Sequence, residues 1–453
     1  MEAIYCCICL DDYVTPKILN SGITICGICM KQTTRCPESL REISVIYEND
    51  FLMRFLRILY SFSMEKLLSS SNRIAYLRRF DRIENNEIRK LLDLPIELFS
   101  LSLEEFKLII DKCINADCTN SNGFRIIHLI CAMGTLDMLK YLVKKGVNLE
   151  CADLKGLRPI HYLHHNNNSL EFIKCLVENG VNLEFPNGDG VKLIHYLCLN
   201  NSLGSVKFLA AQGIDLNCAD RRGWYPIHYA CGDHKLELVK FLIENGADIN
   251  CATSIGIKPI HFACDDGALD LVKFLFLNGA DLNCEDSNRR RPIYNACGSH
   301  NVELVKFLVK NGAEIECEDV DGVRPVHIAC MYGSVDIVKF LVEECDADLE
   351  YCDINGELPI HYACHSISDN LEIIKYLVDS VDLECEDAKG MRPIHTACAH
   401  LNGDNMEPLK YLVEVGGVKL NCPAHNGWTP IQFLFGAAAA PNFIEYLISR
   451  GGQ

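Results

Sequence analysis

Apolar residues recur at helical spacing in paired blocks along most of the chain. In one block Leu236, Val239 and Leu242 fall three residues apart, as side chains on one face of a helix do. A glycine and then a proline precede this block at Gly223 and Pro226. Glycine can adopt the positive φ of a tight turn, and proline suits the first turn of a helix. The pattern therefore predicts a turn followed by two antiparallel helices.

This unit repeats along the chain with a period of 33 or 34 residues, except for a last step of 37. One unit, from Asp220 to Asn250, reads DRRGWYPIHYACGDHKLELVKFLIENGADIN. A histidine usually marks the same position of the unit, and Tyr294 and Gln432 complete the series His128, His161, His195, His228, His261, His327, His361 and His395. Periods of this size are typical of repeat architectures, in which each unit buries its apolar face against its neighbours.

The unit resembles the ankyrin repeat, whose hallmarks are a Thr-Pro-Leu-His tetrapeptide and a Gly-Ala-Asp close. The resemblance covers about ten repeats in residues 119–453, and residues 91–118 resemble a degenerate N-terminal cap repeat. It implies an all-α solenoid of helix-turn-helix repeats. Where the family has its threonine, this chain has Arg158, Tyr225, Lys258, Arg291, Arg324 and Arg392, and only Thr429 keeps it. Without a capping hydroxyl, we expect the inner helices to rely on proline and packing.

Most of the 26 cysteines fall into two columns of the repeat that usually carry alanine in ankyrin repeats. Cysteine there is interpreted as a small apolar filler. Helices stack about 8–10 Å apart, which exceeds the separation a disulfide allows, so neighbours in a column should not bridge. The same distance argues against the histidine column as a metal site. Redox sensing or metal storage is the alternative for the cysteines.

The chain carries a formal net charge of −18, which argues against nucleic acid as its main partner. Its composition, 49% hydrophobic and 23% charged, excludes wholesale disorder. The most apolar run, residues 51–62, contains Arg54 and Arg57 and is too short to span a bilayer. Residues 45–90 are predicted to be a helical linker, and within them residues 51–90 carry a local charge of +5 whose role stays open. A lysine column on the outer helices is interpreted as a solvated face rather than a polyanion site.

Four of the first thirty residues have the spacing of a zinc site. Cys6 and Cys9 form one C-x2-C knuckle, and Cys26 and Cys29 form a second one sixteen residues further on. Four cysteines at this spacing are typical of tetrahedral zinc. We therefore expect one structural Zn²⁺, whose binding energy would help to fold residues 1–44.

The same segment also resembles a RING finger or its zinc-free U-box relative, through its C-x-I-C-L-D opening and its Cys-Pro close. The resemblance places the first metal site on the four knuckle cysteines. It places the second on Ser21, Ile23, Cys36 and Ser39, of which Cys36 alone is a good ligand. It also implies docking of a ubiquitin-conjugating enzyme at Ile8 and Pro37, without a catalytic nucleophile. Two departures weaken it, since Leu40 replaces the expected cation and the usual tryptophan is absent.

Two hypotheses for the function follow. In the first, the solenoid binds a protein target and the N-terminal segment recruits the conjugating enzyme, which makes the chain a candidate ubiquitin ligase. In the second, the chain is an ankyrin adaptor with an inert zinc cap. No phosphate loop, nucleophile elbow or HExxH helix is present, and with no signal peptide visible we expect a reducing compartment, the cytosol or nucleus.

The target is expected on the concave face, at the turn tips and the exposed ends of the inner helices in repeats four to seven. Tryptophan, tyrosine and arginine dominate binding hot spots, and an exposed tryptophan at a tip needs an explanation. The alternative for Trp224 is that it packs onto the next tip as local core. The expected contact residues are Arg221, Arg222, Trp224, Asp233, Asp265, Asp266, Arg290, Met331 and Tyr332.

Overall fold

The computed structural model describes residues 16–18, 24–26, 102–112, 117, 119–120, 122–166, 169–232, 235–332, 334–365, 370–401, 405–436 and 441–452. The chain divides into two compact units, Met1–Gly188 and Asp189–Gln453. The boundary falls just before Leu193, where repeat three lacks the usual proline.

Unit 1 contains the first helical repeats and a short strand pair. Strands β1 (Pro16–Ile18) and β2 (Thr24–Cys26) are antiparallel, and Pro16 pairs with Cys26. Both strands lie within residues 1–44 and outside the repeats, for which the all-α expectation was made. The helices are α8 (Leu103–Lys112), α9 (Ile126–Met133), α10 (Leu136–Lys144), the 3-10 helix η1 (Pro159–His165) and α11 (Ser169–Glu178).

Unit 2 contains eight repeats, each with an inner helix and an outer helix. The inner helices are α12 (Leu193–Leu199), α14 (Pro226–Cys231), α16 (Pro259–Asp265), α18 (Pro292–Gly298), α20 (Pro325–Tyr332), α22 (Pro359–His365), α24 (Pro393–Ala399) and α26 (Pro430–Gly436). The outer helices are α13 (Leu203–Ala211), α15 (Leu236–Glu244), α17 (Leu269–Leu277), α19 (Val302–Lys310), α21 (Val335–Lys339), α23 (Leu371–Val378), α25 (Glu407–Glu414) and α27 (Pro441–Ser449).

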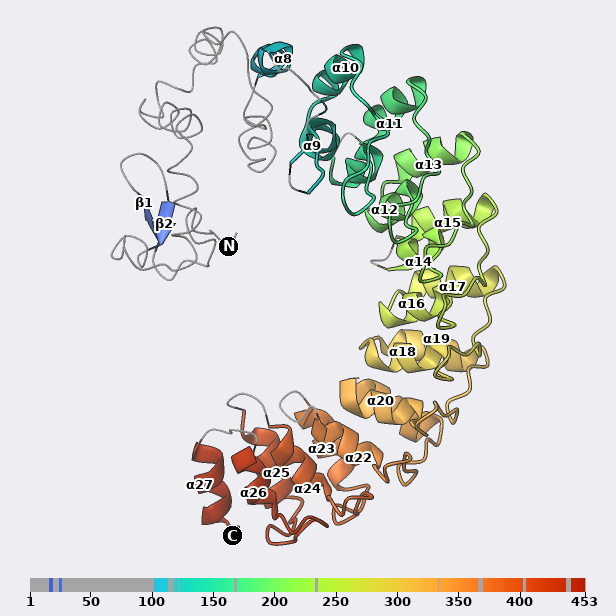
Figure 1. Ribbon diagram of the computed structural model, residues 1–453. Coiled ribbons are helices and arrows are strands. Elements are labelled where there is room, and N and C mark those ends of the chain that lie inside the picture. The colour runs from blue at the N-terminus through green and yellow to red at the C-terminus, as the bar shows by residue number, and fades with distance from the viewer. Residues whose placement is uncertain are drawn as a thin grey trace. The chain divides into compact units, whose positions relative to one another are not determined.

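The helices pair and stack as the repeat pattern predicts. In Figure 1 α16 lies beside α17 and α18 beside α19, and each inner helix of unit 2 packs against the next inner helix. Leu238, Val239 and Leu242 of α15 are fully buried, so the apolar face forms the seam between repeats. Leu236 and Ile243, at the edges of that face, are half-buried.

One outer helix departs from its neighbours. Helix α21 continues directly into a π-helix, η2 (Phe340–Glu344). The turn that follows reaches a positive φ of 55° at Asp346, one residue later than the corresponding Gly312 in the repeat before. The π-turn thus accommodates one additional residue in this repeat.

Candidate functional site

Most turn tips are five-residue elements built on an aspartate. In repeat four the backbone N–H of Asp220 donates to the carbonyl of Trp224 at 2.9 Å. The Asp220 carboxylate accepts from the N–H groups of Arg222, at 2.9 Å, and Trp224, at 2.8 Å. Between them Gly223 has the predicted positive φ, 74°. The side chain therefore satisfies the turn backbone internally, and the exposed residues are held on a fixed frame.

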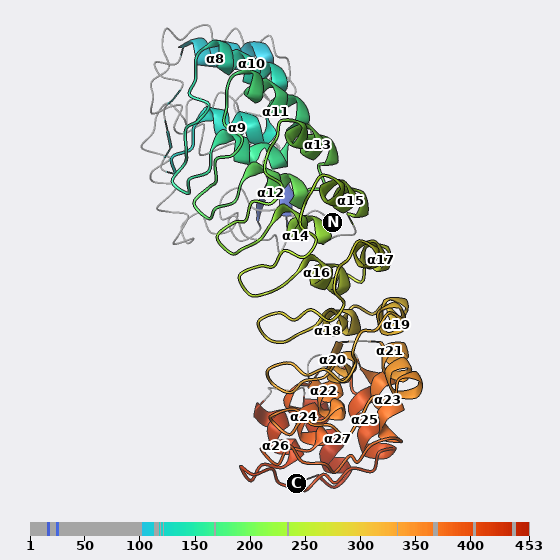
Figure 2. The same cartoon turned by 90° about the vertical axis from the view of Figure 1, so that its right-hand side faces the viewer.

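Neighbouring tips are joined by backbone hydrogen bonds. The N–H of Ser254, on the tip of repeat five, donates to the carbonyl of Arg222 at 3.0 Å. The N–H of Ser287 then donates to Ile255 at 2.9 Å, and that of Val320 to Asn288 at 3.0 Å. Figure 2 shows the loops that precede α14, α16, α18 and α20 projecting to the same side of unit 2. The tips therefore form a continuous row with a defined register.

The histidine column caps the inner helices, a role that the sequence reasoning missed. The Nδ1 of His228 accepts from the N–H of Tyr225 at 3.0 Å, and its Nε2 lies 3.2 Å from the carbonyl of Cys251 in the next repeat. In this bond the N3 side chain accepts from the N–H of the N-cap residue, as the N3 side chain of a capping box does, so the inner helices have a side-chain bond at this end in addition to the predicted proline and packing. Equivalent Nδ1 bonds are made by His128, His161, His195, His261, His327, His361 and His395.

These histidines are neutral and fully engaged. Burial lowers the pKa of His228 to about 4, so the ring carries a proton on Nε2 alone near neutral pH. With one nitrogen accepting and the other donating, no lone pair remains for a metal. Among the described residues, no group of three or more His, Cys, Asp or Glu side chains is placed to hold a metal ion.

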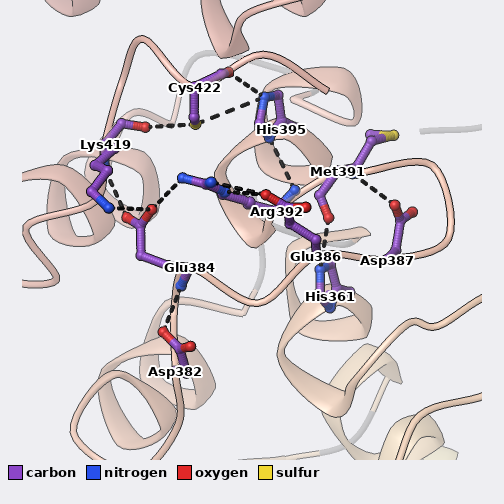
Figure 3. A network of polar contacts seen from close by, with 10 residues as sticks. All are labelled: His361, Asp382, Glu384, Glu386, Asp387, Met391, Arg392, His395, Lys419 and Cys422. Carbon is purple, nitrogen blue, oxygen red and sulfur yellow. Dashed lines mark hydrogen bonds and ion pairs between the residues drawn. The ribbon is translucent and has the colours of Figure 1, made fainter. Parts of the chain in front are cut away.

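The arginines that replace the family's threonine are committed to ion pairs. In Figure 3 the Arg392 guanidinium donates to Glu386, at 2.8 Å, and also pairs with Glu384. The other oxygen of Glu384 accepts from the backbone N–H of Lys419 at 2.9 Å, which links repeat eight to repeat nine. Related pairs are made by Arg158, Arg291 and Arg324. These cations stabilise the stack and are not available to a ligand.

Trp224 is packed rather than free. The residue is half-buried, and its ring centroid lies 4.8 Å from that of Phe262 in the next repeat and 5.2 Å from that of Tyr229. Arg222 lies over the same ring, with 5.4 Å between the guanidinium carbon and the centroid. The alternative of local packing therefore describes this side chain, and its outer surface is what a partner could reach.

The other expected contact residues fall on the tips and helix ends. Arg221 and Asp265 are exposed, and Arg222 exposes 68% of its side chain. Tyr332, at the end of α20, is 52% exposed. Asp266 and Met331 are half-buried, and Asp233 lies outside the described residues. Arg290 is exposed, and its Nε lies 3.5 Å from Asp319 on the next tip. The tips of repeats four to seven thus lie in one row, and their role in binding stays a prediction.

Arg289 is a tip residue that the sequence reasoning missed. It is exposed and has a φ of 62°, at a tip position that glycine occupies in the other repeats of unit 2. A side chain in this region of φ is strained by about 1 kcal/mol or more. The signal was present in the sequence, since the series of tip glycines is interrupted at this position alone between Gly256 and Gly322.

The described cysteines act mainly as fillers. Those from Cys131 to Cys422 are free thiols, and the column on the inner helices is fully buried, as at Cys231 and Cys264. Burial raises the pKa of Cys317 to about 11, which disfavours the reactive thiolate. Cys352 departs from the filler prediction, because it is exposed.

The lysine column is solvated and locally paired, as predicted. Lys240 pairs with Glu237 at 2.8 Å and Lys306 with Glu303 at 2.9 Å, one helical turn apart. Such exposed pairs contribute little to stability and leave no continuous basic stripe on the outer helices of unit 2.

The N-terminal candidates are largely outside the described residues. This holds for Cys6, Cys9 and Cys29, and for Ile8 and Pro37, while Cys26 is described only as the last residue of β2. The zinc site and the docking site therefore stay predictions.

A comparison with family models identifies the repeats. A family model described as "Ankyrin repeats (3 copies)" matches residues 100–187, 160–253, 260–351, 293–384 and 360–453. Among solved structures, the ankyrin repeat domain of human ASB11 is 25% identical, with a TM-score of 0.42, over 46% of this chain and 92% of that chain. A search of curated proteins finds no significant match. None of the helices in the described ranges has the length and hydropathy that crossing a bilayer requires.

Proposed function

Because the chain belongs to the ankyrin repeat family and is a protein–protein interaction scaffold, we propose that unit 2 binds its target on one defined surface. This recognition face comprises the tips and inner-helix ends of repeats four to seven, with Arg221, Arg222, Trp224, Asp265, Asp266, Arg290, Met331 and Tyr332.

The observation that carries this proposal is the hydrogen-bonded row of tips. Since the Asp220 carboxylate and the bonds between tips satisfy the turn backbone, the tip side chains need not order themselves when a partner binds. The exposed ring of Tyr332 and the guanidinium of Arg222 are of the types that dominate hot spots.

The test compares two surfaces of the same unit. Targets captured by cross-linking and mass spectrometry should be lost when Arg222→Ala is combined with Tyr332→Ala, two changes that remove no core packing. The matched control, Lys240→Glu, lies on outer helix α15 and should leave capture unchanged. The recognition face is misplaced if Lys240→Glu abolishes capture while the double change does not.

We also propose that the N-terminal segment binds one Zn²⁺ through Cys6, Cys9, Cys26 and Cys29 and couples the target to ubiquitin transfer. The knuckle spacing supports the metal, and the antiparallel pairing of β1 with β2 supports a chain reversal between the two knuckles. Ile8 and Pro37 are the proposed contacts to a conjugating enzyme. The alternative function is an ankyrin adaptor with an inert zinc cap.

Elemental analysis and an autoubiquitination assay separate these alternatives. We expect one zinc per chain, lost in Cys26→Ala, and ubiquitin chains that disappear when a chelator is added. Two zincs per chain would show that the second site was misjudged. Zinc binding without ubiquitin transfer would favour the inert cap. The free thiols support a reducing compartment, the cytosol or nucleus.

A further inference from the structure

Two tips of unit 2 concentrate positive charge on a chain that is strongly acidic overall. The tip of repeat four carries Arg221 and Arg222, and the tip of repeat six carries Arg289 and Arg290. All four side chains are exposed. Against a net charge of −18, this basic tip patch is a local reversal of sign.

The carboxylates beneath these tips are already occupied. Asp220 is buried and accepts from two backbone N–H groups and from the Tyr229 hydroxyl at 2.8 Å, so its Arg222 contact is long, 3.8 Å. Asp286 likewise accepts from the N–H groups of Asn288 and Arg290. Arg290 lies 3.5 Å from Asp319 of the next tip, whereas, among the described residues, Arg221 and Arg289 form no ion pair. The patch therefore keeps most of its charge for a ligand.

The backbone at Arg289 gives a second, independent indication. Every other tip of unit 2 has glycine here, with φ between 70° and 83°, whereas Arg289 has a φ of 62°. Strain of this kind concentrates where a side chain serves a function. The arginine thus stands at a position that stability alone would give to glycine.

The surroundings limit where an acidic ligand can lie. Exposed carboxylates flank the patch on the tips of repeats three and seven, at Asp189 and Asp321, and Asp265 follows at the end of α16. These would repel an acidic chain that extended further along the row or toward the inner helices. Between the two basic tips Ile255 is 54% exposed and offers an apolar contact.

We propose that the basic tip patch binds an extended acidic segment of a partner protein, with carboxylates on the two arginine pairs and an apolar side chain on Ile255. Neighbouring repeats lie about 8–10 Å apart, so the two basic tips are about 16–20 Å apart. An extended chain rises about 3.3 Å per residue, which places the two acidic positions about five or six residues apart. This inference rests on the proposed function and specifies the chemistry of its partner.

The test uses a labelled peptide, GEESLSSEEG, in which the centres of the two Glu pairs are six residues apart, and fluorescence polarisation with the full chain. Arg222→Ala combined with Arg289→Gly should weaken binding about tenfold, since two exposed ion pairs are lost. The single change Arg289→Lys keeps the positive charge at this tip and should therefore retain most of the affinity for the peptide. The matched control is Lys389→Ala, an exposed cation on the tip of repeat nine, which should have no effect. Peptides with Glu replaced by Gln, or with Leu replaced by Ser, should bind more weakly, and added salt should reduce the affinity.

Three results would overturn the proposal. They are no binding of the peptide, a loss of affinity in Lys389→Ala as large as in the double variant, and tighter binding of a twelve-residue oligothymidylate than of the peptide. The last result would show that the patch binds phosphate groups rather than carboxylates. If the peptide fails while target capture still depends on Arg222 and Tyr332, the recognition face stands and only the acidic ligand is wrong. If capture instead depends on the outer helices, the proposed function itself fails.

Discussion

At the scale of single residues, the histidine column combines capping and stacking in one side chain. The His228 ring accepts from its own helix N-terminus and reaches a carbonyl of the following repeat. In repeat ten a glutamine replaces the histidine, and the side chain of Gln432 accepts a hydrogen bond from the backbone N–H of Thr429 at 2.9 Å. This bond is equivalent to the one between His228 and Tyr225. Tyr294 instead keeps the bond to the next repeat, through its hydroxyl and the carbonyl of Cys317 at 2.7 Å. Two functions of one side chain are thus separable.

The lowered pKa of His228 predicts acid sensitivity. Burial holds the pKa near 4 in the folded chain, against about 6.5 when the histidine is unfolded. Between these two pKa values the unfolded state binds one proton more than the folded state. The contribution of His228 to the free energy of unfolding is therefore fully present above about pH 6.5. It is lost as the pH falls toward 4, at about 1.4 kcal/mol per pH unit.

His228→Gln should keep the cap and remove this proton. The free energy of unfolding is measured by urea unfolding at several pH values between 7 and 4.5. In His228→Gln it should change less steeply with pH than in the parent chain, and the difference should correspond to about one proton taken up on unfolding. His425→Gln, on an exposed tip, is the matched control. An unchanged slope in His228→Gln would mean that the ring is not neutral in the folded state.

At the scale of the element, the sequence predicted the repeat unit because its determinants are local. The glycine of the tip, the proline of the inner helix and the apolar face of the outer helix all lie within one unit. The role of His228 was not predictable in this way, because its second partner lies 23 residues away, in the next repeat. The packing of Trp224 on Phe262 could be stated only as an alternative for the same reason, since it also depends on the stacking of repeats.

The tips offer a matched pair of substitutions with opposite expected signs. A Cβ added at Gly223 would lie 2.5 Å from the backbone nitrogen of Ser254, in addition to the strain of its positive φ. Gly223→Ala should therefore destabilise unit 2 by about 1–3 kcal/mol. Arg289→Gly relieves strain at the equivalent position and should stabilise by about 1 kcal/mol. Chemical denaturation measures both.

A stabilised Arg289→Gly variant that also binds the acidic peptide less tightly would show that stability and recognition compete at this tip. If Arg289→Gly were instead destabilising, the arginine would have a structural role and its φ would not be strained. Equal effects of the two changes would contradict the steric argument for Gly223.

At the scale of the whole molecule, the sequence predicted one array of ten repeats, and the structure divides it into two compact units after Gly188. Periodicity reports that repeats are present, but it does not report how strongly consecutive repeats pack. The unusual start of repeat three, at Leu193, was visible in the sequence, whereas a boundary there depends on tertiary contacts.

The division predicts that residues 189–453 fold as a separate fragment. In this unit each inner helix packs against the next, from α12 through α26, and stability in repeat arrays is approximately a sum of such nearest-neighbour terms. The basic tip patch lies wholly within the fragment. Circular dichroism should show cooperative unfolding, and the fragment should bind the acidic peptide within about twofold of the full chain, because no contact of the patch is removed. If the fragment folds cooperatively but binds the peptide tenfold more weakly, part of the binding site for the acidic peptide lies in residues 1–188. If the fragment shows no cooperative transition, the folding of the second unit depends on the first.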